Sequence, residues 1–187
     1  TPKEAVVYRR QGAAMKAVST IATYGVRQVK MGKGPYLKLK KGKNLFVKRA
    51  DVALATGLNT PPPATLKPDE RWVEVDLANN ILYAVQGNTI KKVFLTAGSD
   101  ETPTGTYRVY WKLIQQTFNR QRNKEAYYLE AVPWVMFFKE SYGIHGAYWH
   151  DEFGRIKTHG CINLSPVDAK WLFNFISQSL PPGSLSL

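Results

Sequence analysis

The chain has 187 residues, of which 44% are hydrophobic, and it contains five tryptophans. This composition predicts an ordinary packed core and excludes a disordered chain, and no apolar run approaches the roughly 20 residues that a membrane helix needs. The net charge of +12 is uneven, because residues 1–58 hold 13 Lys and Arg against two acidic residues whereas residues 59–187 hold 13 against 12. Such an asymmetry predicts an anionic partner for the N-terminal part, with a solvated lysine-rich surface as the alternative.

The first 58 residues predict a small antiparallel β-domain. Alternating or apolar runs indicate strands, and glycine-containing segments indicate turns. Strands are expected at 5–8, 25–30, 35–40 and 45–48, turns at 31–34 and 41–44, and helical turns in the alanine-rich stretches 13–22 and 50–56. Short, regularly spaced strands are typical of a small barrel, and the order of glycine, aromatic and apolar residues from Tyr24 to Val47 resembles a bacterial SH3-like module.

A proline-rich segment separates two predicted domains. It holds three consecutive prolines, from Pro61 to Pro63, which lack backbone donors and keep the chain extended. The charge balance changes at the same place. The sequence therefore predicts an accessory domain over 1–58, a semi-rigid linker over 59–69 and a second domain over 70–187.

The second domain is predicted to be mainly β with one helix near its end. Alternating or apolar runs indicate strands at 71–77, 81–85, 89–95 and 132–138, and residues 102–110 indicate a turn entering a strand. Residues 112–128 are polar and weakly periodic, which indicates a loop or lid. Ser165 followed by Pro166 is a helix start signal, and apolar residues recur with a helical period as far as 176.

The side chains best suited to nucleophilic and acid–base chemistry lie in one window, residues 145–161. It contains the only cysteine, Cys161, and all three histidines, His145, His150 and His159. The thiolate is the nucleophilic form of cysteine, and a nearby imidazole can take its proton. Two alternatives remain open: a buried structural cysteine, and a zinc site built from these four residues, although the H-x4-H-x8-H-x-C spacing matches no common zinc module.

The segment 158–163 is the candidate centre of this site. If it is extended, His159, Cys161 and Asn163 share one face, because successive side chains alternate along a strand. Gly160 would let a substrate approach the backbone, and the neighbouring amides would form an oxyanion hole for acyl transfer. This geometry leaves open which histidine takes the thiol proton.

The order of residues along the chain excludes several cysteine enzymes. No histidine follows Cys161, which excludes the cysteine-then-histidine order of papain-like and related peptidases. No arginine follows it either, which disfavours sortases, where an arginine is expected after the nucleophile.

Two motifs in this region carry a family resemblance. They are Tyr142-Gly143-Ile144-His145-Gly146 and Thr158-His159-Gly160-Cys161-Ile162-Asn163-Leu164. Together they resemble the signature of the YkuD-type L,D-transpeptidases, and the stretch from Ala147 to Gly154 resembles one branch of that family. The segments 72–77 and 103–107 stand where the family has its opening strand and its Pro-Thr-Gly turn, so the resemblance covers residues 70 to about 177.

The resemblance implies a β-rich catalytic domain, sandwich- or barrel-like with a C-terminal helix, and acyl transfer on peptidoglycan. The Cys161 thiol would attack the carbonyl of the third residue of a tetrapeptide stem and release D-alanine, and an amine of a neighbouring stem would then take the acyl group in a 3→3 cross-link. By position, His145 is the base and is oriented by the backbone at Gly146. His159 lines the site, and the amides of Gly160 and Cys161 hold the oxyanion.

The resemblance also implies a set of substrate-binding residues. They are Thr158, Asn163, Trp149, Tyr148 and Arg155. Asn163 stands where many members carry an arginine. We therefore expect another basic residue, Arg155 or Lys157, to bind a substrate carboxylate.

These features predict an enzyme of the bacterial cell envelope. We expect a monomer, in the cell wall or periplasm, that acts on peptidoglycan stem peptides without a cofactor or metal, has no nucleic-acid partner and no transmembrane segment, and binds anionic cell-wall polymer through residues 1–58. Its first residues carry no apolar signal-peptide core, so the export signal or anchor is expected outside this sequence. The alternative functions are an L,D-carboxypeptidase and a degenerate, non-catalytic wall-binding protein.

Overall fold

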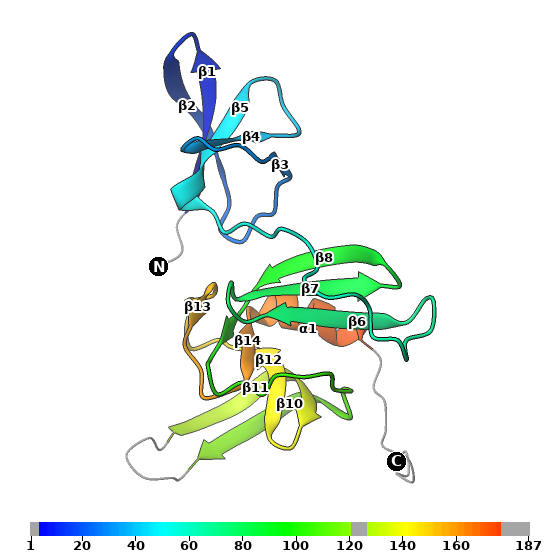
Figure 1. Cartoon of the computed structure of the whole chain (residues 1–187). Coiled ribbons are helices and arrows are strands. Elements are labelled where there is room, and N and C mark those ends of the chain that lie inside the picture. The colour runs from blue at the N-terminus through cyan, green and yellow to red at the C-terminus, as the bar shows by residue number, and fades with distance from the viewer. Residues whose placement is uncertain (1–3, 121–126, 177–187) are drawn as a thin grey trace. The chain divides into compact units, whose positions relative to one another are not determined.

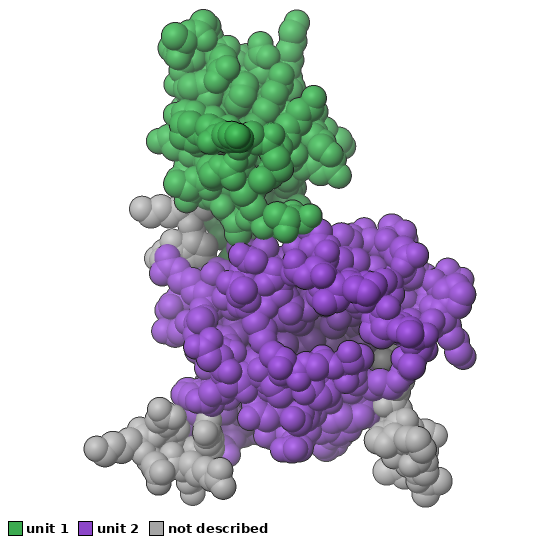
Figure 2. Space-filling view, in the orientation of Figure 1, with its two compact units in different colours: residues 1–56 green, residues 57–187 purple. Residues whose placement is uncertain are grey.

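The computed structural model describes residues 4–120 and 127–176 of the chain. The chain divides into two compact units, residues 1–56 and residues 57–187 (Figure 2). Each unit has its own buried apolar cluster, and the two are described separately below. None of the helices in the described ranges is long and apolar enough to cross a membrane.

The N-terminal unit is built on one antiparallel sheet, whose described strands follow the order β2-β1-β5-β4-β3 (Figure 1). The elements are β1 (Ala5–Gln11), β2 (Ala14–Ile21), β3 (Val29–Lys30), β4 (Tyr36–Leu39), β5 (Leu45–Lys48) and the short 3-10 helix η1 (Arg49–Asp51). One face of the sheet is apolar and packs into the core of this unit. Its buried residues are Ala5, Val7, Ile21, Leu37, Leu39 and Val47.

Three local predictions for this unit were wrong. The stretch 13–22, predicted to contain helical turns, forms β2, which pairs with β1 in a hairpin closed at Gly12 with a φ of +62°. Cross-strand pairing here overrides the helix preference of alanine. The strand predicted at 25–30 is reduced to β3, and the helical turn predicted at 50–56 is limited to η1.

The second unit combines two sheets and one helix. A meander of β6 (Arg71–Asp76), β7 (Ile81–Gln86) and β8 (Thr89–Leu95) forms the smaller sheet. Over the described residues, the larger sheet has the order β10-β11-β12-β14-β9-β13. Its strands are β9 (Ala97–Gly98), β10 (Trp111–Arg120), β11 (Tyr127–Lys139), β12 (Tyr142–Gly146), β13 (Arg155–Ile156) and β14 (Ile162–Leu164), and the helix is α1 (Pro166–Phe175). The predicted class, mainly β with one helix near the C-terminal end, is confirmed.

One apolar cluster joins both sheets to the helix. Its buried members come from β7 and β8, from β11, β12 and β14, and from α1: Leu82, Ala84, Phe94, Met136, Ile144, Ile162, Leu164, Ala169, Leu172 and Ile176. The helix begins as its Ser-Pro signal predicts: Ser165 Oγ accepts a hydrogen bond from the Asp168 amide at 3.2 Å, and Pro166 opens the first turn. This packing holds β12 and β14 against a rigid base.

The described part of the region predicted to be a loop or lid, 112–128, belongs instead to two paired strands. In the described ranges, β10 pairs with β11 from Trp111 opposite Phe137 to Arg120 opposite Tyr127. The polar sequence of β10 does not indicate a strand, because the strand depends on pairing with β11. Phe118 of β10 also packs on Phe137 of β11, with ring centroids 6.4 Å apart. The strand that the predicted turn at 102–110 enters begins at Trp111. Residues 121–126 lie outside the described residues.

The proline-rich segment lies against the second unit. Thr60 Oγ1 donates a hydrogen bond to Glu74 at 2.6 Å, and the Asn59 amide donates to the same carboxylate at 2.7 Å. Leu58 and Leu66 pack on the apolar cluster of β6 and β7. The predicted linker is therefore fixed to the second unit near each of its ends.

Candidate active site

The segment that carries the lone cysteine bends before it enters the larger sheet. The amides of Lys157 and Thr158 both donate to the carbonyl of Gly98, at 2.9 and 3.3 Å, which ties the segment to β9. Residues 158–160 then form a bend, and Gly160 has a φ of +114°. The supposition of an extended segment is therefore wrong, because the left-handed residue breaks the alternation on which a shared face depends.

The bend requires glycine at position 160 and is closed by a hydroxyl. A Cβ atom on Gly160 would lie 2.9 Å from Cδ1 of Tyr142 and closer still to its Cε1. Thr158 Oγ1 donates to the carbonyl of Cys161 at 2.6 Å and accepts from the Gly160 amide at 3.3 Å. Tyr142 and Thr158 thus fix the path of the backbone immediately before Cys161.

We predict that Gly160→Ala destabilises the fold by about 2 kcal/mol, since the new methyl group adds a steric clash to the strain of a left-handed alanine. Chemical denaturation measures this loss. Gly57→Ala is the matched control, because Gly57 has the same φ of +114° and no atom within 4 Å of the place where a Cβ would stand. Equal losses in the two variants would contradict a role for the Tyr142 contact.

Cys161 lies at the start of β14 with its thiol turned to backbone. Its Sγ–H donates to the carbonyl of Ser141 at 3.8 Å. Burial raises the pKa of the Cys161 thiol, and a hydrogen bond from the Gly143 backbone opposes this more weakly. The resting side chain is therefore a neutral thiol near pH 7.

His145 occupies the middle of β12 and is 2% exposed. Its Nδ1 lies 3.2 Å from the carbonyl oxygen of Gly146. Since a carbonyl only accepts, Nδ1 carries the proton and Nε2 keeps its lone pair. Phe118 contacts the ring edge-on at 5.0 Å, and Trp149 lies 5.9 Å away. This arrangement gives a neutral imidazole with Nε2 available as a proton acceptor.

Burial lowers the pKa of His145 to about 4. In the unfolded chain the ring takes up a proton near its ordinary pKa of 6.5, so between these values the unfolded state binds more protons than the folded state. The free energy of unfolding must then fall as the pH falls through this range. Near pH 7 the ring is neutral in both states and no such loss occurs.

We predict that acidification from pH 6.5 to 4 removes about 3 kcal/mol of stability through His145. Urea denaturation across this range should show a steeper loss for the wild type than for His145→Gln. His159→Gln is the control and should retain the wild-type slope. If the free energy of unfolding falls equally with pH in the wild type and in His145→Gln, burial of this ring does not cause the loss of stability in acid.

The other predicted site residues occupy distinct positions around this pair. His159 is exposed and stacks on Tyr127 of β11, with ring centroids 5.9 Å apart. Tyr148 donates to the carbonyl of Glu130 at 2.6 Å and meets Trp149 edge-on at 5.1 Å. A ring of aromatic side chains from β10, β11 and the loop after β12 thus borders the cysteine and histidine segments.

One glycine and two basic residues complete the predicted set. Gly146 has no room for a side chain, because a Cβ there would lie 3.0 Å from Pro133 and 3.1 Å from Pro166. Arg155 is exposed on β13, whereas Lys157 forms an ion pair with Glu152 at 3.1 Å. Of the two basic candidates for a substrate carboxylate, Lys157 is therefore already paired in this state.

The structure adds a contact of His150, which the sequence had grouped with the reactive side chains and with the alternative zinc site but had given no role of its own. His150 Nε2 lies 3.0 Å from Asn163 Nδ2, and the Glu152 amide donates to His150 Nδ1 at 3.2 Å. Asn163 itself is 4% exposed and pairs with His145 in the parallel register of β12 and β14. No sequence spacing distinguished His150, because its contact to Asn163 depends on the path of the intervening loop.

Histidines and the cysteine do not gather into a metal cage. Within the described ranges, His, Cys, Asp and Glu side chains form no group of three or more that could hold a metal ion. His145 bonds to a backbone carbonyl, His150 to Asn163, and Cys161 to a backbone carbonyl.

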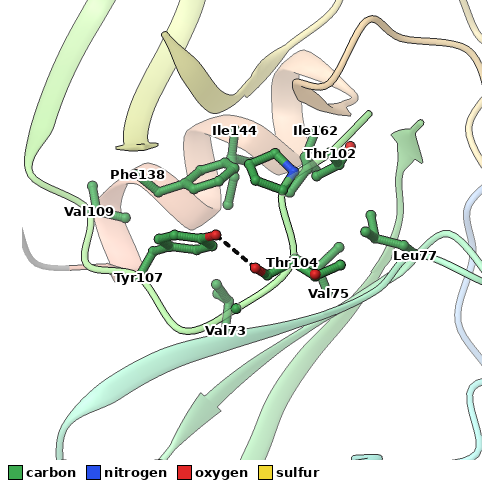
Figure 3. Close-up of a pocket in the computed structure, with 12 residues that line it drawn as sticks. Val73, Val75, Leu77, Thr102, Thr104, Tyr107, Val109, Phe138, Ile144 and Ile162 are labelled. Atoms are coloured by element: carbon green, nitrogen blue, oxygen red, sulfur yellow. Dashed lines mark hydrogen bonds between the residues drawn. The ribbon is translucent and has the colours of Figure 1, made fainter. Parts of the chain in front are cut away.

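A cavity of about 200 Å³ lies on the other face of the same strands (Figure 3). Figure 3 shows Ile144 and Ile162 on one side of it and Val73 and Val75 on the other, with Tyr107 bonded to the carbonyl of Thr104 at 2.8 Å. Because neighbouring side chains on a strand alternate, Ile144 faces this cavity while His145 faces away from it. The cavity therefore lies behind the strand pair that carries the candidate site.

Comparison with known proteins identifies the class. Residues 70–182 match the family model described as the L,D-transpeptidase catalytic domain. This match covers more than half of the chain, and the chain belongs to this family. Over 140 residues it is 25% identical to YciB of Bacillus subtilis (strain 168), a protein named as an L,D-transpeptidase, and the match covers 60% of this chain and 64% of YciB.

Solved structures of the same class share the fold. An L,D-transpeptidase from Mycobacterium smegmatis superposes with a TM-score of 0.55 at 21% identity, covering 59% of this chain and 56% of that one. An Enterococcus faecium L,D-transpeptidase with a cysteine-to-serine substitution gives 0.52 at 25% identity over 60% and 48%. The catalytic domain of the E. faecium enzyme acylated by ertapenem gives 0.51 at 24% identity over 60% and 94%. The chain thus spans less than two thirds of YciB and of the first two structures.

Proposed function

We propose that this protein is a peptidoglycan L,D-transpeptidase in which Cys161 forms the acyl-enzyme. The observation that carries the proposal is the orientation of His145: its Nδ1–H is held by the Gly146 carbonyl at 3.2 Å, which leaves Nε2 as an acceptor. Family membership supports the same assignment. The donor substrate is a tetrapeptide stem, and the acceptor is a side-chain amine of a neighbouring stem.

The proposed reaction proceeds in two acyl-transfer steps. In the first, Cys161 Sγ bonds to the carbonyl carbon of the third stem residue, the bond to D-alanine breaks, and the thiol proton passes through His145 to the leaving amine. In the second, the acceptor amine attacks the thioester, the C–S bond breaks as the amide forms, and the proton lost by the amine passes through His145 to the released thiolate. The product is a 3→3 cross-link, and no cofactor is required for the proton and electron balance.

The electrostatics of the site indicate that proton transfer accompanies attack. Burial raises the pKa of Cys161 and lowers that of His145 to about 4, so a thiolate–imidazolium pair is unfavourable in the resting state. Transfer therefore needs charge stabilisation at the substrate carbonyl. The amides of Gly160 and Cys161 would supply it; the Gly160 amide makes only a 3.3 Å bond to Thr158 Oγ1, which an oxyanion can replace.

The same acyl-enzyme supports a carboxypeptidase if water replaces the acceptor amine. Incubation with a defined tetrapeptide donor, with and without an acceptor stem, separates the two functions by their products. Because peptidoglycan lies outside the cytoplasm, the proposed substrate also places the protein in the cell wall or periplasm.

A carbapenem is the direct probe of the proposed nucleophile. We predict that mass spectrometry of the intact protein after incubation with ertapenem shows one covalent adduct, and that Cys161→Ala abolishes it because the attacking sulfur is lost. Circular dichroism checks that the variant is folded. A folded Cys161→Ala protein that still forms the adduct or still cross-links would refute the assignment.

The same assay separates the two candidate bases. His145→Gln should slow acylation by at least 100-fold, in the usual range for loss of general-base catalysis. His159→Gln should slow it by less than tenfold, since this ring stacks on Tyr127 at the border of the site. A larger effect at His159 would exchange the two roles.

We also propose that the N-terminal unit binds an anionic cell-wall polymer. The observation that favours this is the composition of its outer sheet face, the face opposite the apolar core. Register pairs Lys30 with Lys38, Lys38 with Phe46, and Phe46 with Tyr8, so these four positions form a row across β3, β4, β5 and β1, in which Phe46 is buried by its neighbours. A row of cations and rings suits a polymer that carries repeated anionic groups on sugars or polyols.

Three further residues extend this row into a patch. Arg10 lies over the ring of Phe46 at 4.8 Å, Lys48 lies over the ring of Tyr8 at 5.5 Å, and Tyr36 meets Tyr8 edge-on at 5.5 Å. Contact with an aromatic ring stabilises each of these two cations at its position. The outer face is thus more ordered at Arg10 and Lys48 than a surface of freely solvated lysines.

Binding of the full-length chain to purified sacculi tests this surface. We predict that Arg10→Gln, Lys38→Gln and Lys48→Gln together weaken sedimentation with sacculi about tenfold at low salt, and that added salt weakens wild-type binding as well. Sacculi stripped of anionic polymer should not bind.

The matched control removes the same charge from loops of the same unit, through Arg27→Gln, Lys33→Gln and Lys43→Gln. This control should bind within about twofold of the wild type. Equal losses in the two triple variants would favour a general lysine-rich surface over an outer-face site.

A further inference from the structure

The two-residue strand β9 holds the cysteine segment, residues 157–161, at both of its ends. On one edge, β9 pairs with β13, where Ile156 lies beside Gly98. On its other edge, β9 pairs with β14, where Asn163 lies beside Ala97. The chain therefore leaves one edge of β9, passes through the cysteine segment and returns along the other edge. A shift of β9 would move both ends of this segment together.

Asn80 fixes β9 from the smaller sheet. It lies in the turn between β6 and β7. Its side-chain Oδ1 accepts a hydrogen bond from the Gly98 amide at 3.0 Å, and its backbone carbonyl accepts from the Thr96 amide at 2.8 Å. Asn80 is thus bonded to the residue before β9 and to the last residue of β9. The position of β9 in the larger sheet is therefore set by a residue of the smaller one.

The carbonyl of Gly98 extends this connection to the cysteine segment. It accepts from the Thr158 amide at 3.3 Å and from the preceding amide at 2.9 Å. The Thr158 hydroxyl in turn donates to the carbonyl of Cys161 and accepts from the amide of Gly160. A continuous series of hydrogen bonds therefore runs from the Asn80 carboxamide, through the backbone of Gly98, to the two amides that are candidates for the oxyanion hole.

The buried polar side chains of the described residues gather around this connection. They are Asn80, Thr96, Ser99, Thr102, His145 and Asn163. The first four border β9, and the other two are neighbours in β12 and β14. A contact that only packed β9 could be made by apolar side chains without the cost of burying polar groups. Directed hydrogen bonds, in contrast, specify one position of the backbone.

We propose that Asn80 is a positioning residue of the active site: its carboxamide oxygen fixes β9, so that the Gly98 carbonyl aligns the cysteine segment and the amides of Gly160 and Cys161 are directed at the developing oxyanion. The direction toward an oxyanion rests on the proposed transpeptidase function, whereas the placement of the segment does not. The φ of Asn80 is +51°, a conformation that glycine adopts as readily. The turn by itself therefore does not require the carboxamide.

Hydrogen exchange of backbone amides tests the placement without substrate or activity. Asn80→Gly keeps the left-handed turn but removes the acceptor of the Gly98 amide, whereas Asn80→Asp tolerates the same turn and retains an acceptor oxygen. In NMR spectra of the full chain, the amides of Lys157 and Thr158 should exchange about tenfold faster in Asn80→Gly and within about threefold of the wild type in Asn80→Asp. Unchanged exchange in a folded Asn80→Gly protein would overturn the proposal.

Two controls separate a local effect from a general loss of stability. Asn44→Gly replaces another left-handed asparagine, with a φ of +55°, in the N-terminal unit, and it should leave the exchange of Lys157 and Thr158 unchanged. The amides of β11 are the internal reference, because general destabilisation would accelerate their exchange as well. Equal acceleration in β11 and in the cysteine segment of Asn80→Gly would contradict a local role of Asn80.

Two reactions of the same thiol test whether the amides are directed at an oxyanion. Attack on the carbonyl of ertapenem develops an oxyanion, whereas alkylation by iodoacetamide occurs at a saturated carbon and does not. We expect Asn80→Gly to slow acylation at saturating ertapenem about tenfold and alkylation less than about twofold. Asn80→Asp should recover most of the acylation rate. Equal slowing of both reactions would overturn the proposal, because it would reflect a general disturbance of Cys161.

The same experiments keep this proposal distinct from the proposed transpeptidase function. A wild-type protein that is alkylated at Cys161 but not acylated by ertapenem would refute the enzyme proposal. The exchange of the Lys157 and Thr158 amides in Asn80→Gly would then still decide whether Asn80 places the cysteine segment.

Discussion

The parallel pairing of β12 with β14 is the constraint on which the rest of the site depends. Its register sets Ile144 beside Ile162, His145 beside Asn163 and Gly146 beside Leu164. Two segments that are 18 residues apart in sequence therefore become neighbours at fixed spacing. The pair buries its isoleucines against α1 and the smaller sheet, so displacement of His145 would disturb the core, which is packed too densely to yield by small amounts. Gly146 is part of the same constraint, because only a hydrogen fits between Pro133 and Pro166.

This rigid placement has an electrostatic consequence. The burial that fixes His145 also lowers its pKa to about 4, and the burial of Cys161 raises the pKa of the thiol. Both shifts oppose charge separation before a substrate is bound. These shifts favour a protonated sulfur at rest. In the proposed mechanism, the stabilisation of developing charge is left to backbone amides and to the bound substrate, so that reactivity is linked to occupancy rather than to a permanent ion pair.

The two units divide the chemistry of the chain. The first unit carries most of the excess positive charge of the chain, with Arg10 and Lys48 over aromatic rings of its sheet, and it contains none of the histidines or the cysteine. The second unit has nearly balanced charge and carries the reactive groups. The proposed polymer binding and the proposed acyl transfer would therefore depend on different residues.

The amino-acid sequence by itself determined the class of fold, the family and the segments that carry the reactive groups. These predictions rest on local signals: the Cys161 and His145 motifs, the Ser165-Pro166 helix start and the alternation along β6 and β7. Local signals can be interpreted without knowledge of the tertiary contacts. Only the tertiary structure decided the rest. Ala14–Ile21 and Trp111–Arg120 became strands because of partners elsewhere in the chain, and Gly160 turned left-handed because Tyr142 occupies the space beside it. His150 reached Asn163 through the path of a loop. Each of these outcomes depends on contacts between distant residues, and composition and spacing carry no record of such contacts.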